Sequence, residues 1–380
     1  MAVIAVNPDL VIWAREFRGL DRAAAAARLS VTEQELAAIE AGERKVNLTF
    51  FRKLSDRFRI PRATLLRRTR PQVPPMPMDF RTVEGREATL GFDVRLAISH
   101  AYTIEQNILE LVDADAAPPT PVLPHIGLRE NASEAGERER RRLGIGGVTQ
   151  LAWPSDEAFR NWRTIIEGTG VYVLLKKWDR SDCLGFTIYR DRNAPIIVIN
   201  KADEYEPVRT FTLIHEYAHL LLRQPGISDQ NDANPVEAYC NRFAGGFLMP
   251  RAVLAEILPY WPERPVEWTL DQIREWARRL KVSQQALALR LEQLGVAPQG
   301  YYERLVEMQR LRPRTPGGNY NNTQVNELGD RFTSTVLSAE NQRLITRSEA
   351  AEILDLAPRY FDGVREQIGR QLARVGAGGR

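Results

Sequence analysis

The pattern of apolar and polar positions divides the chain into segments of different character. Over the first seventy residues, apolar positions recur every three or four residues between helix caps, as in "SVTEQELAAIEAG". This spacing is typical of short amphipathic helices that pack in a bundle. The Pro-rich stretch "PQVPPMPMDFR" then interrupts the helical pattern. The sequence therefore predicts a helical bundle over residues 1–70 and a linker over 71–85.

The pattern changes after residue 170. Three runs, "VYVLLKKW", "CLGFTIYR" and "PIIVIN", are rich in β-branched and aromatic residues and are separated by short polar turns. They predict a small antiparallel sheet. Helical patterns precede the sheet, including one long helix over 86–113, and follow it to the end of the chain. We expect a mainly α (α+β) protein with a central domain over 86–310 and a helical C-terminal region over 311–380.

Composition places the chain among ordinary globular proteins. Hydrophobic residues make up 43% and charged residues 27%, which excludes a disordered or fibrous protein. We find no apolar run long enough to span a membrane and no secretory signal, so we expect a cytoplasmic location. The two cysteines, Cys183 and Cys240, cannot form a disulfide framework. We expect both thiols to be small buried side chains rather than ligands or nucleophiles.

Charge is distributed unevenly along the chain. Residues 1–70 contain 14 Lys and Arg against 8 Asp and Glu, a balance of +6. The other residues contain 38 against 41, a balance of −3. A basic N-terminal module indicates contact with nucleic acid without establishing it.

The segment "FTLIHEYAHLLLR" contains two of the four histidines of the chain. Residues four apart lie on one face of a helix, so His215 and His219 can place two imidazoles around one ion. Glu216 can reach a water at that ion without being a ligand, as the H-E-x-x-H arrangement requires. Imidazole and carboxylate ligands favour zinc, and a catalytic zinc site keeps one position open. The alternative is a polar helix face without a metal, but the surrounding leucines predict a buried helix.

A third ligand must come from the residues that follow. Asp229 and Asp232 lie in the polar loop "ISDQNDAN", where side-chain positions are poorly fixed. Glu237 lies on a helix that Asn234 caps, and apolar neighbours draw its carboxylate towards the interior. We therefore predict Glu237 as the third ligand. Asn241, one helical turn later, is predicted to hydrogen-bond one of the ligands.

A zinc ion at this site would support hydrolysis of a peptide bond. Zinc lowers the pKa of water and polarises a carbonyl group, and Glu216 would act as the general base. The strand at 195–200 or the strand at 183–190 could bind an extended peptide as an added strand. A purely structural sheet is the alternative.

Two segments together resemble a known family. "RTFTLIHEYAHLLL", followed by "VEAYCNRFAGGFLMP", resembles the ImmA/IrrE zinc metallopeptidases, with their H-E-x-x-H, E-A-x-x-N-x-F-A and L-M-P motifs. Similarity is strong over these segments and looser from roughly 86 to 310. Ala218 stands where many relatives have glycine. The resemblance implies a zincin-like fold and a gluzincin-like metalloendopeptidase, with His215, His219 and Glu237 as zinc ligands and Glu216 as the base.

The same resemblance implies a substrate class. Members of the family cleave a helix-turn-helix repressor or an antitoxin, which derepresses stress-response or mobile-element genes. We therefore expect a narrow specificity for such a protein partner.

The N-terminal segment "LSVTEQELAAIEAGERK" resembles a helix-turn-helix of the lambda-repressor (XRE) type. In that type the second helix of the motif enters the major groove. Here that helix offers carboxylates and alanines, which are poor partners for DNA. The candidate DNA-contacting residues are Arg22, Arg28, Gln34, Arg44 and Lys45. The alternative is that the module binds protein, either the substrate repressor or a second copy of this chain in a dimer.

Two functions from different classes remain open. The first is an intracellular zinc endopeptidase fused to a helix-turn-helix module. The second is a DNA-binding transcription regulator whose peptidase fold senses a metal or ligand without cleaving. The intact Glu216 favours the first function, because a purely binding site has no use for a base at that position.

Overall fold

The computed structural model describes residues 3–4, 6–71, 90–113, 122–179, 183–190, 194–202, 205–224, 234–310, 324–356, 361–366 and 368. Across these ranges the protein is mainly helical with a small three-stranded sheet, which confirms the predicted fold class. The predicted linker at 71–85 lies, apart from Pro71, outside the described residues. The domain limits at 70, 86 and 310 stay predictions. Among the described helices, none is long and apolar enough to cross a membrane.

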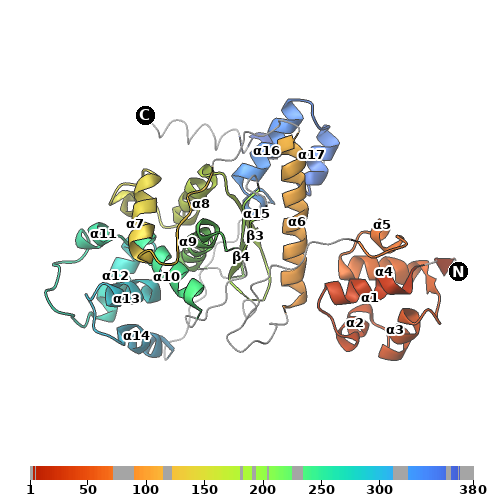
Figure 1. Cartoon of the computed structure of the whole chain (residues 1–380), viewed down its shortest axis with the longest axis horizontal. Coiled ribbons are helices and arrows are strands. Elements are labelled where there is room, and N and C mark those ends of the chain that lie inside the picture. The colour runs from red at the N-terminus through yellow and green to blue at the C-terminus, as the bar shows by residue number, and fades with distance from the viewer. Residues whose placement is uncertain are drawn as a thin grey trace.

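The N-terminal module is a five-helix bundle with its own core and a short two-stranded ribbon (Figure 1). Its elements are β1 (Val3–Ile4), α1 (Pro8–Phe17), α2 (Arg22–Leu29), α3 (Glu33–Glu40), β2 (Val46–Asn47), α4 (Leu48–Phe58) and α5 (Arg62–Leu65). Helix α3 starts with the predicted capping box, in which Thr32 and Glu35 each bond the other's backbone. Leu36 and Leu54, both fully buried, lie in the core of the bundle.

The central sheet contains β3 (Tyr172–Lys176), β4 (Gly185–Ile188) and β5 (Ile196–Asn200) in the order β3-β5-β4. Strand β4 pairs with β5 antiparallel, but β3 pairs with β5 parallel. The prediction of a wholly antiparallel sheet is therefore wrong. Strand β5 follows β4 along the chain and lies between β4 and β3 in the sheet. The sequence pattern predicts which segments are strands, but it does not predict which strands become neighbours.

Both faces of the sheet are covered by helices. Alternate strand residues point to opposite faces, so Ile197 and Ile199 lie in one apolar core while Ile196 and Val198 lie in another. The first core is formed with α8 (Ala158–Gly168) and α9 (Glu206–Leu222), and the second with α6 (Phe92–Asp113). Figure 1 shows the sheet between α9 and α6. The helix predicted over 86–113 begins at Phe92.

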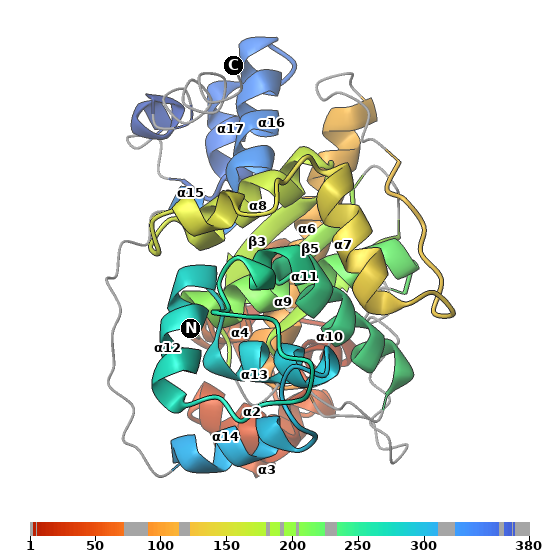
Figure 2. The same cartoon turned by 90° about the vertical axis from the view of Figure 1, so that its left-hand side faces the viewer.

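Further helices surround α9 and complete the first core (Figure 2). They are α7 (Ala132–Arg142), the 3-10 turn η1 (Thr149–Ala152), α10 (Pro235–Leu248), α11 (Arg251–Ala255), α12 (Leu270–Leu280), α13 (Gln284–Gln293) and α14 (Tyr301–Arg310). Helices α7 and α10 cross closely because Gly136 and Gly246 lie at the crossing. A Cβ on either glycine would lie within 3 Å of the backbone of the other helix.

The C-terminal region packs on the second core and covers one edge of the sheet. It contains α15 (Gln324–Leu328), α16 (Asp330–Asn341) and α17 (Arg347–Ile353). Helix α15 lies beside the edge strand β3 (Figure 1), where Glu327 forms an ion pair with Lys201. The guanidinium of Arg163 donates to the carbonyl of Val173 on β3 and, at 2.5 Å, to the carbonyl of Asn326. Strand β4 is the other edge strand of the described sheet.

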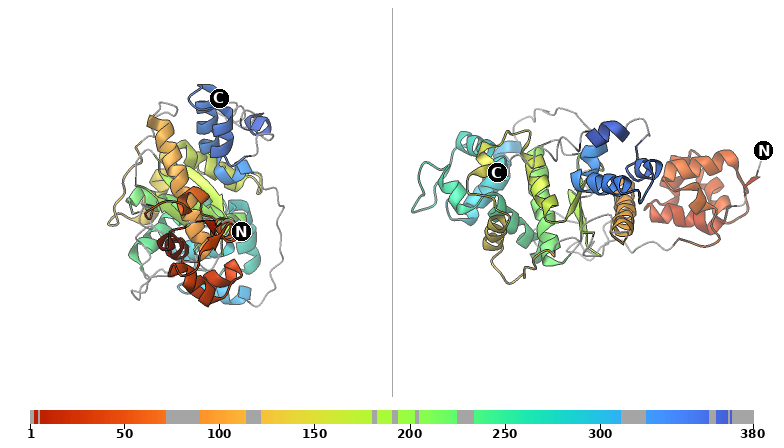
Figure 3. Two further views of the ribbon diagram at one scale, coloured as in Figure 1. Left: turned by 90° about the vertical axis from the view of Figure 1, so that its right-hand side faces the viewer. Right: turned by 90° about the horizontal axis from the view of Figure 1, so that it is seen from above.

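The N-terminal module contacts the outer side of α6. Seen from above in Figure 3, the module lies beyond α6, on the side away from the sheet. The guanidinium carbon of Arg28 lies 3.6 Å from the ring centroid of Phe92, which is a cation–π contact. Arg18, only 3% exposed, donates to the hydroxyl of Ser99.

Candidate metal centre

Helix α9 carries the two predicted histidine ligands in the interior of the protein. Apolar residues surround its second half, so the helix is buried almost all round. His215, Glu216 and His219 are only 6%, 0% and 3% exposed. The helix ends at Arg223, which adopts a left-handed conformation at the C-cap. A buried polar trio of this kind needs partners, because unpaired polar groups in the interior cost free energy.

Three donor groups converge at one point of this interior. The Nε2 atoms of His215 and His219 are 3.2 Å apart. The two carboxylate oxygens of Glu237 lie 3.0 Å from His215 Nε2 and 3.2 Å from His219 Nε2. In a tetrahedral zinc site with ligand distances of about 2.0–2.1 Å, neighbouring donor atoms are about 3.3 Å apart. The three residues therefore fit the donor set and spacing of a zinc ion.

The other nitrogen of each imidazole contacts a hydrogen-bonding oxygen. His215 Nδ1 lies 2.8 Å from Asn241 Oδ1, and His219 Nδ1 lies 3.2 Å from the carbonyl oxygen of Gln224. Such partners place the proton on Nδ1 and leave the lone pair of Nε2 available to a metal ion. The structure thus brings the predicted Asn241 to the site. The Gln224 carbonyl was not predicted from the sequence, because its position depends on the left-handed turn at the end of α9.

Glu237 reaches the histidines from the first turn of α10. Asn234 caps this helix by accepting a hydrogen bond from the Val236 backbone, and Glu237 is only 3% exposed. Burial raises the pKa of the Glu237 carboxyl, but the two imidazoles that face the carboxyl outweigh the burial and lower the pKa to about 2. The carboxyl group is therefore ionised at neutral pH, as a metal ligand must be. The alternative ligands Asp229 and Asp232 lie outside the described residues.

Cys240 lies closer to the histidines than the sequence indicated. It is fully buried, as expected, but its sulfur and the imidazole nitrogens of His215 and His219 lie within 4.8 Å of one another. Its spacing from Glu237, one turn along α10, is the signal for this position. Burial, followed by the charges of Glu237 and Glu216, raises the pKa of the thiol. The Glu237 oxygens lie 3.0 and 3.2 Å from the imidazole nitrogens and carry charge, whereas the thiol keeps its proton, which favours the carboxylate as the third donor.

Comparison with protein families supports the same interpretation. Residues 166–292 match the model of the M78 peptidase family, described as IrrE N-terminal-like domain. The chain therefore contains a segment that is similar to the M78 peptidases. Residues 11–65 match a model described as helix-turn-helix, so the predicted combination of an ImmA/IrrE-type domain with an N-terminal XRE-type module is confirmed. No curated protein matches the chain.

Within the M78 domain, Glu216 lies against the first residue of β4. A Cβ placed on Gly185 would lie 2.8 Å from Glu216 Oε1 and 3.1 Å from its Cγ. Glycine therefore leaves the space that the carboxylate occupies. Sequence reasoning missed Gly185, since the glycine in "CLGFTIYR" gives no indication of which side chain fills the space beside it.

A polar network holds α9 of the M78 domain against α7. The hydroxyl of Tyr217 donates to Glu139 Oε1 at 2.6 Å, and Arg142 Nη2 lies 2.6 Å from the same oxygen. Burial and the neighbouring Glu139 raise the pKa of Tyr217, so the hydroxyl keeps its proton. The contact fixes the residue next to Glu216.

The two strands predicted as candidate docking edges differ in the structure. Strand β5, within the predicted 195–200, is paired on both sides and cannot accept a further strand. That part of the prediction is wrong. An apolar run such as "PIIVIN" is compatible with both a central strand and an edge strand, so the sequence does not distinguish the two positions. Strand β4, within the predicted 183–190, is an edge strand and contacts α9.

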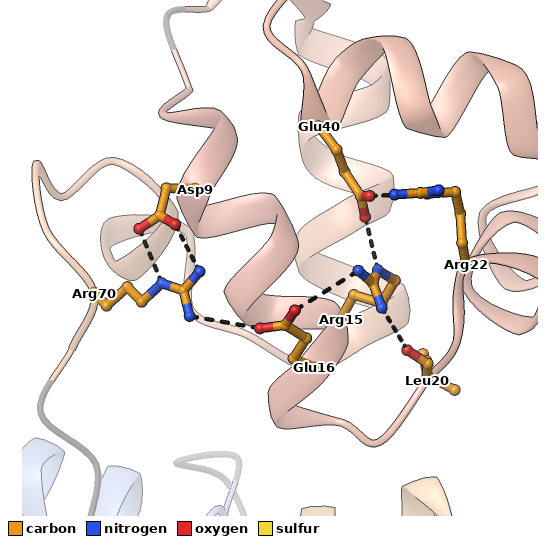
Figure 4. Close-up of polar contacts among 7 residues, drawn as sticks. All are labelled: Asp9, Arg15, Glu16, Leu20, Arg22, Glu40 and Arg70. Atoms are coloured by element: carbon orange, nitrogen blue, oxygen red, sulfur yellow. Dashed lines mark hydrogen bonds and ion pairs between the residues drawn. The ribbon is translucent and has the colours of Figure 1, made fainter.

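In the helix-turn-helix module, ion pairs engage some of the predicted DNA-contacting residues. Arg22 Nε lies 3.0 Å from Glu40 Oε2, while Arg15 Nε lies 2.7 Å from the other oxygen of the same carboxylate. Figure 4 shows Glu40 between these two guanidinium groups. Because Glu40 is buried, the pair with Arg22 is part of the module's internal structure.

Two further candidates also contact groups within the protein. Arg44 Nη1 lies 2.6 Å from Glu35 Oε1. Arg28 lies over the Phe92 ring and donates to the carbonyl of Arg57 at 3.0 Å. The other two predicted contacts, both exposed on the module surface, are Gln34 and Lys45.

Proposed function

We propose that this chain is a zinc-dependent endopeptidase of narrow specificity. The observation that carries the proposal is the convergence of two imidazole nitrogens and a carboxylate within 3.0–3.2 Å of one another, beside a buried glutamate. His215, His219 and Glu237 would hold the ion, and Glu216 would act as general base. The M78 family match supports a metallopeptidase.

Each residue of the centre has a distinct part in this proposal. The metal, when bound, lowers the pKa of water and polarises the carbonyl of the peptide bond. Glu216 accepts a proton from the attacking water on its carboxylate and delivers it to the leaving amine. Asn241 and the Gln224 carbonyl hold the imidazole rings in orientation. The burial of Glu216 keeps other water molecules from competing for the carboxylate.

The substrate would bind along β4. This strand is an edge strand in the described part of the sheet, and it begins at Gly185, next to Glu216. An extended peptide added to that edge would pass the base. Resemblance to the ImmA/IrrE family supports a helix-turn-helix repressor or an antitoxin as the substrate, with derepression of stress-response or mobile-element genes in the cytoplasm as the outcome.

A DNA-binding regulator that cleaves nothing is the second candidate. The helix-turn-helix match favours it. However, Arg22, Arg28 and Arg44 already bind groups within the protein, which weakens the phosphate contacts that DNA binding needs. A salt-dependent mobility shift with DNA from upstream of the gene would support this candidate.

Co-incubation separates the two candidates. The full chain and its Glu216→Gln variant are each incubated with repressors encoded nearby, with zinc or with a chelator. We expect cleavage only with the unaltered chain in the presence of zinc. Equal loss of the repressor with both proteins would contradict the peptidase proposal.

A further inference from the structure

Gly185 occupies a place in β4 where any other residue would contact the candidate base. A Cβ at this position would lie 2.8 Å from Glu216 Oε1 and 3.0 Å from the methyl carbon of Thr212. Ordinary contacts between carbon atoms are about 3.5–4.0 Å. The backbone of Gly185 does not have a positive φ, so its conformation is open to other residues. Space for the neighbouring side chains is therefore what requires a glycine.

The two neighbours differ in how they can respond to an added methyl group. Thr212 is held in place, because its hydroxyl donates to the Val208 carbonyl at 3.0 Å. The Glu216 carboxylate is the end of a side chain with three rotatable bonds. A Cβ at Gly185 would also lie 3.1 Å from Glu216 Cγ, so an alanine at position 185 would be accommodated mainly by rotation about the side-chain bonds of Glu216, which moves the carboxylate.

We propose that Gly185 is a positioning residue, whose bare backbone determines where the Glu216 carboxylate lies beside the metal ligands. This inference rests on the proposed peptidase function. A general base must be held within about 0.5 Å of its working position, and an error of about 1 Å costs on the order of 100-fold in rate. Gly185 would thus control catalysis without touching the substrate's reacting atoms.

A matched pair of glycine variants tests the inference. Gly185→Ala is compared with Gly168→Ala, because a Cβ at Gly168 would meet no atom within 4 Å. Full-length proteins are loaded with Co²⁺, and acetohydroxamate is titrated while the visible spectrum of the metal is recorded. A hydroxamate binds the metal and hydrogen-bonds a correctly placed glutamate, so its affinity reports the position of the carboxylate without needing the protein substrate.

We expect all variants to take up the same amount of Co²⁺. Gly185→Ala and Glu216→Gln should each weaken acetohydroxamate binding by about 10-fold, the loss expected for one charge-assisted hydrogen bond. The double variant should be no weaker than Glu216→Gln alone, because both changes remove the same contact. Gly168→Ala should bind like the unaltered chain.

Several results would overturn the inference about Gly185 without contradicting the proposed function. They are unchanged binding in Gly185→Ala, a further loss when it is combined with Glu216→Gln, or loss of metal or of folded protein in Gly185→Ala, which would assign the glycine a purely structural part. A chain that takes up no Co²⁺ at all would instead contradict the proposed function. The two failures are thereby distinguishable.

Discussion

Arg18 Nη1 donates to the hydroxyl of Ser99 at 2.8 Å and so joins the helix-turn-helix module to α6. The same guanidinium also binds the carbonyls of Phe58 and Arg59 at the end of α4, each at 2.8 Å. Burial lowers the pKa of Arg18 to about 10, so the group stays charged at neutral pH. A single buried cation therefore closes the end of one helix and anchors the module to the next domain.

Replacement of Arg18 by alanine should destabilise the module. The carbonyls at the end of α4 would lose their donor inside the protein, which costs about 1–3 kcal/mol. Urea unfolding of the full chain measures the change. Arg52→Ala, on the exposed side of α4, is the control and should stay within about 0.5 kcal/mol of the unaltered chain. Equal stability of the two variants would show that the Arg18 contacts do not form.

Gly329→Ala should detach the C-terminal region from the edge strand β3. The residue has φ +85°, and an added Cβ would lie 2.6 Å from both Arg163 Nη2 and the carbonyl oxygen of Val173. Gly295→Ala is the control for a positive φ without crowding, since Gly295 has φ +68° with no atom within 4 Å of a Cβ. Gly329, with φ +85° and ψ 155°, lies in a backbone region that only glycine adopts readily, so alanine costs more there than at Gly295, and the overpacking adds about 1–3 kcal/mol. Similar melting temperatures for the two variants would contradict the packing of α15 on β3.

Stability should fall as the pH rises from 5 to 8, in part because of Glu167. Burial raises the pKa of this carboxyl to about 7, and nearby Arg163 only partly opposes the effect. Since the folded pKa exceeds the unfolded value of 4.5, the folded state binds more protons, and the stabilisation present below pH 4.5 is lost as the pH rises through 7. The total is about 3 kcal/mol.

Glu167→Gln should remove this part of the pH dependence. Unfolding free energies at pH 5 and pH 8 should differ less in the variant than in the unaltered chain. The exposed Glu275→Gln serves as control and should leave the slope unchanged. An identical slope in all three proteins would mean that Glu167 titrates normally.

Asn241→Ala should weaken metal binding while the ligands stay in place. Without the contact between Asn241 Oδ1 and His215 Nδ1, the ring loses its fixed tautomer and orientation. Loss of such a partner lowers metal affinity by about 10–100-fold. Competition with a zinc-sensitive chelating dye measures the change, with Asn161→Ala on α8 as control. Equal affinities of the two variants would refute the part given to Asn241.

The sequence predicted those features that depend on local spacing. The four-residue interval between His215 and His219, and the capped helix that carries Glu237, place these side chains by helical geometry alone. Long-range pairing escaped prediction. The position of β5 between β3 and β4, and the contact of Gly185 with Glu216, depend on which segments become neighbours, and apolar pattern does not encode that choice. The contacts of Arg28 and Arg44 were missed for the same reason.

The metal content of the purified full chain tests the proposed centre most directly. Protein freed of loosely bound ions is analysed for zinc, together with the His219→Ala and Glu237→Ala variants. We expect about one zinc ion per unaltered chain, as a three-ligand catalytic site holds, and far less than one in each variant. An unaltered chain without a stoichiometric metal ion, or variants that retain the same amount, would contradict a zinc site formed by His215, His219 and Glu237.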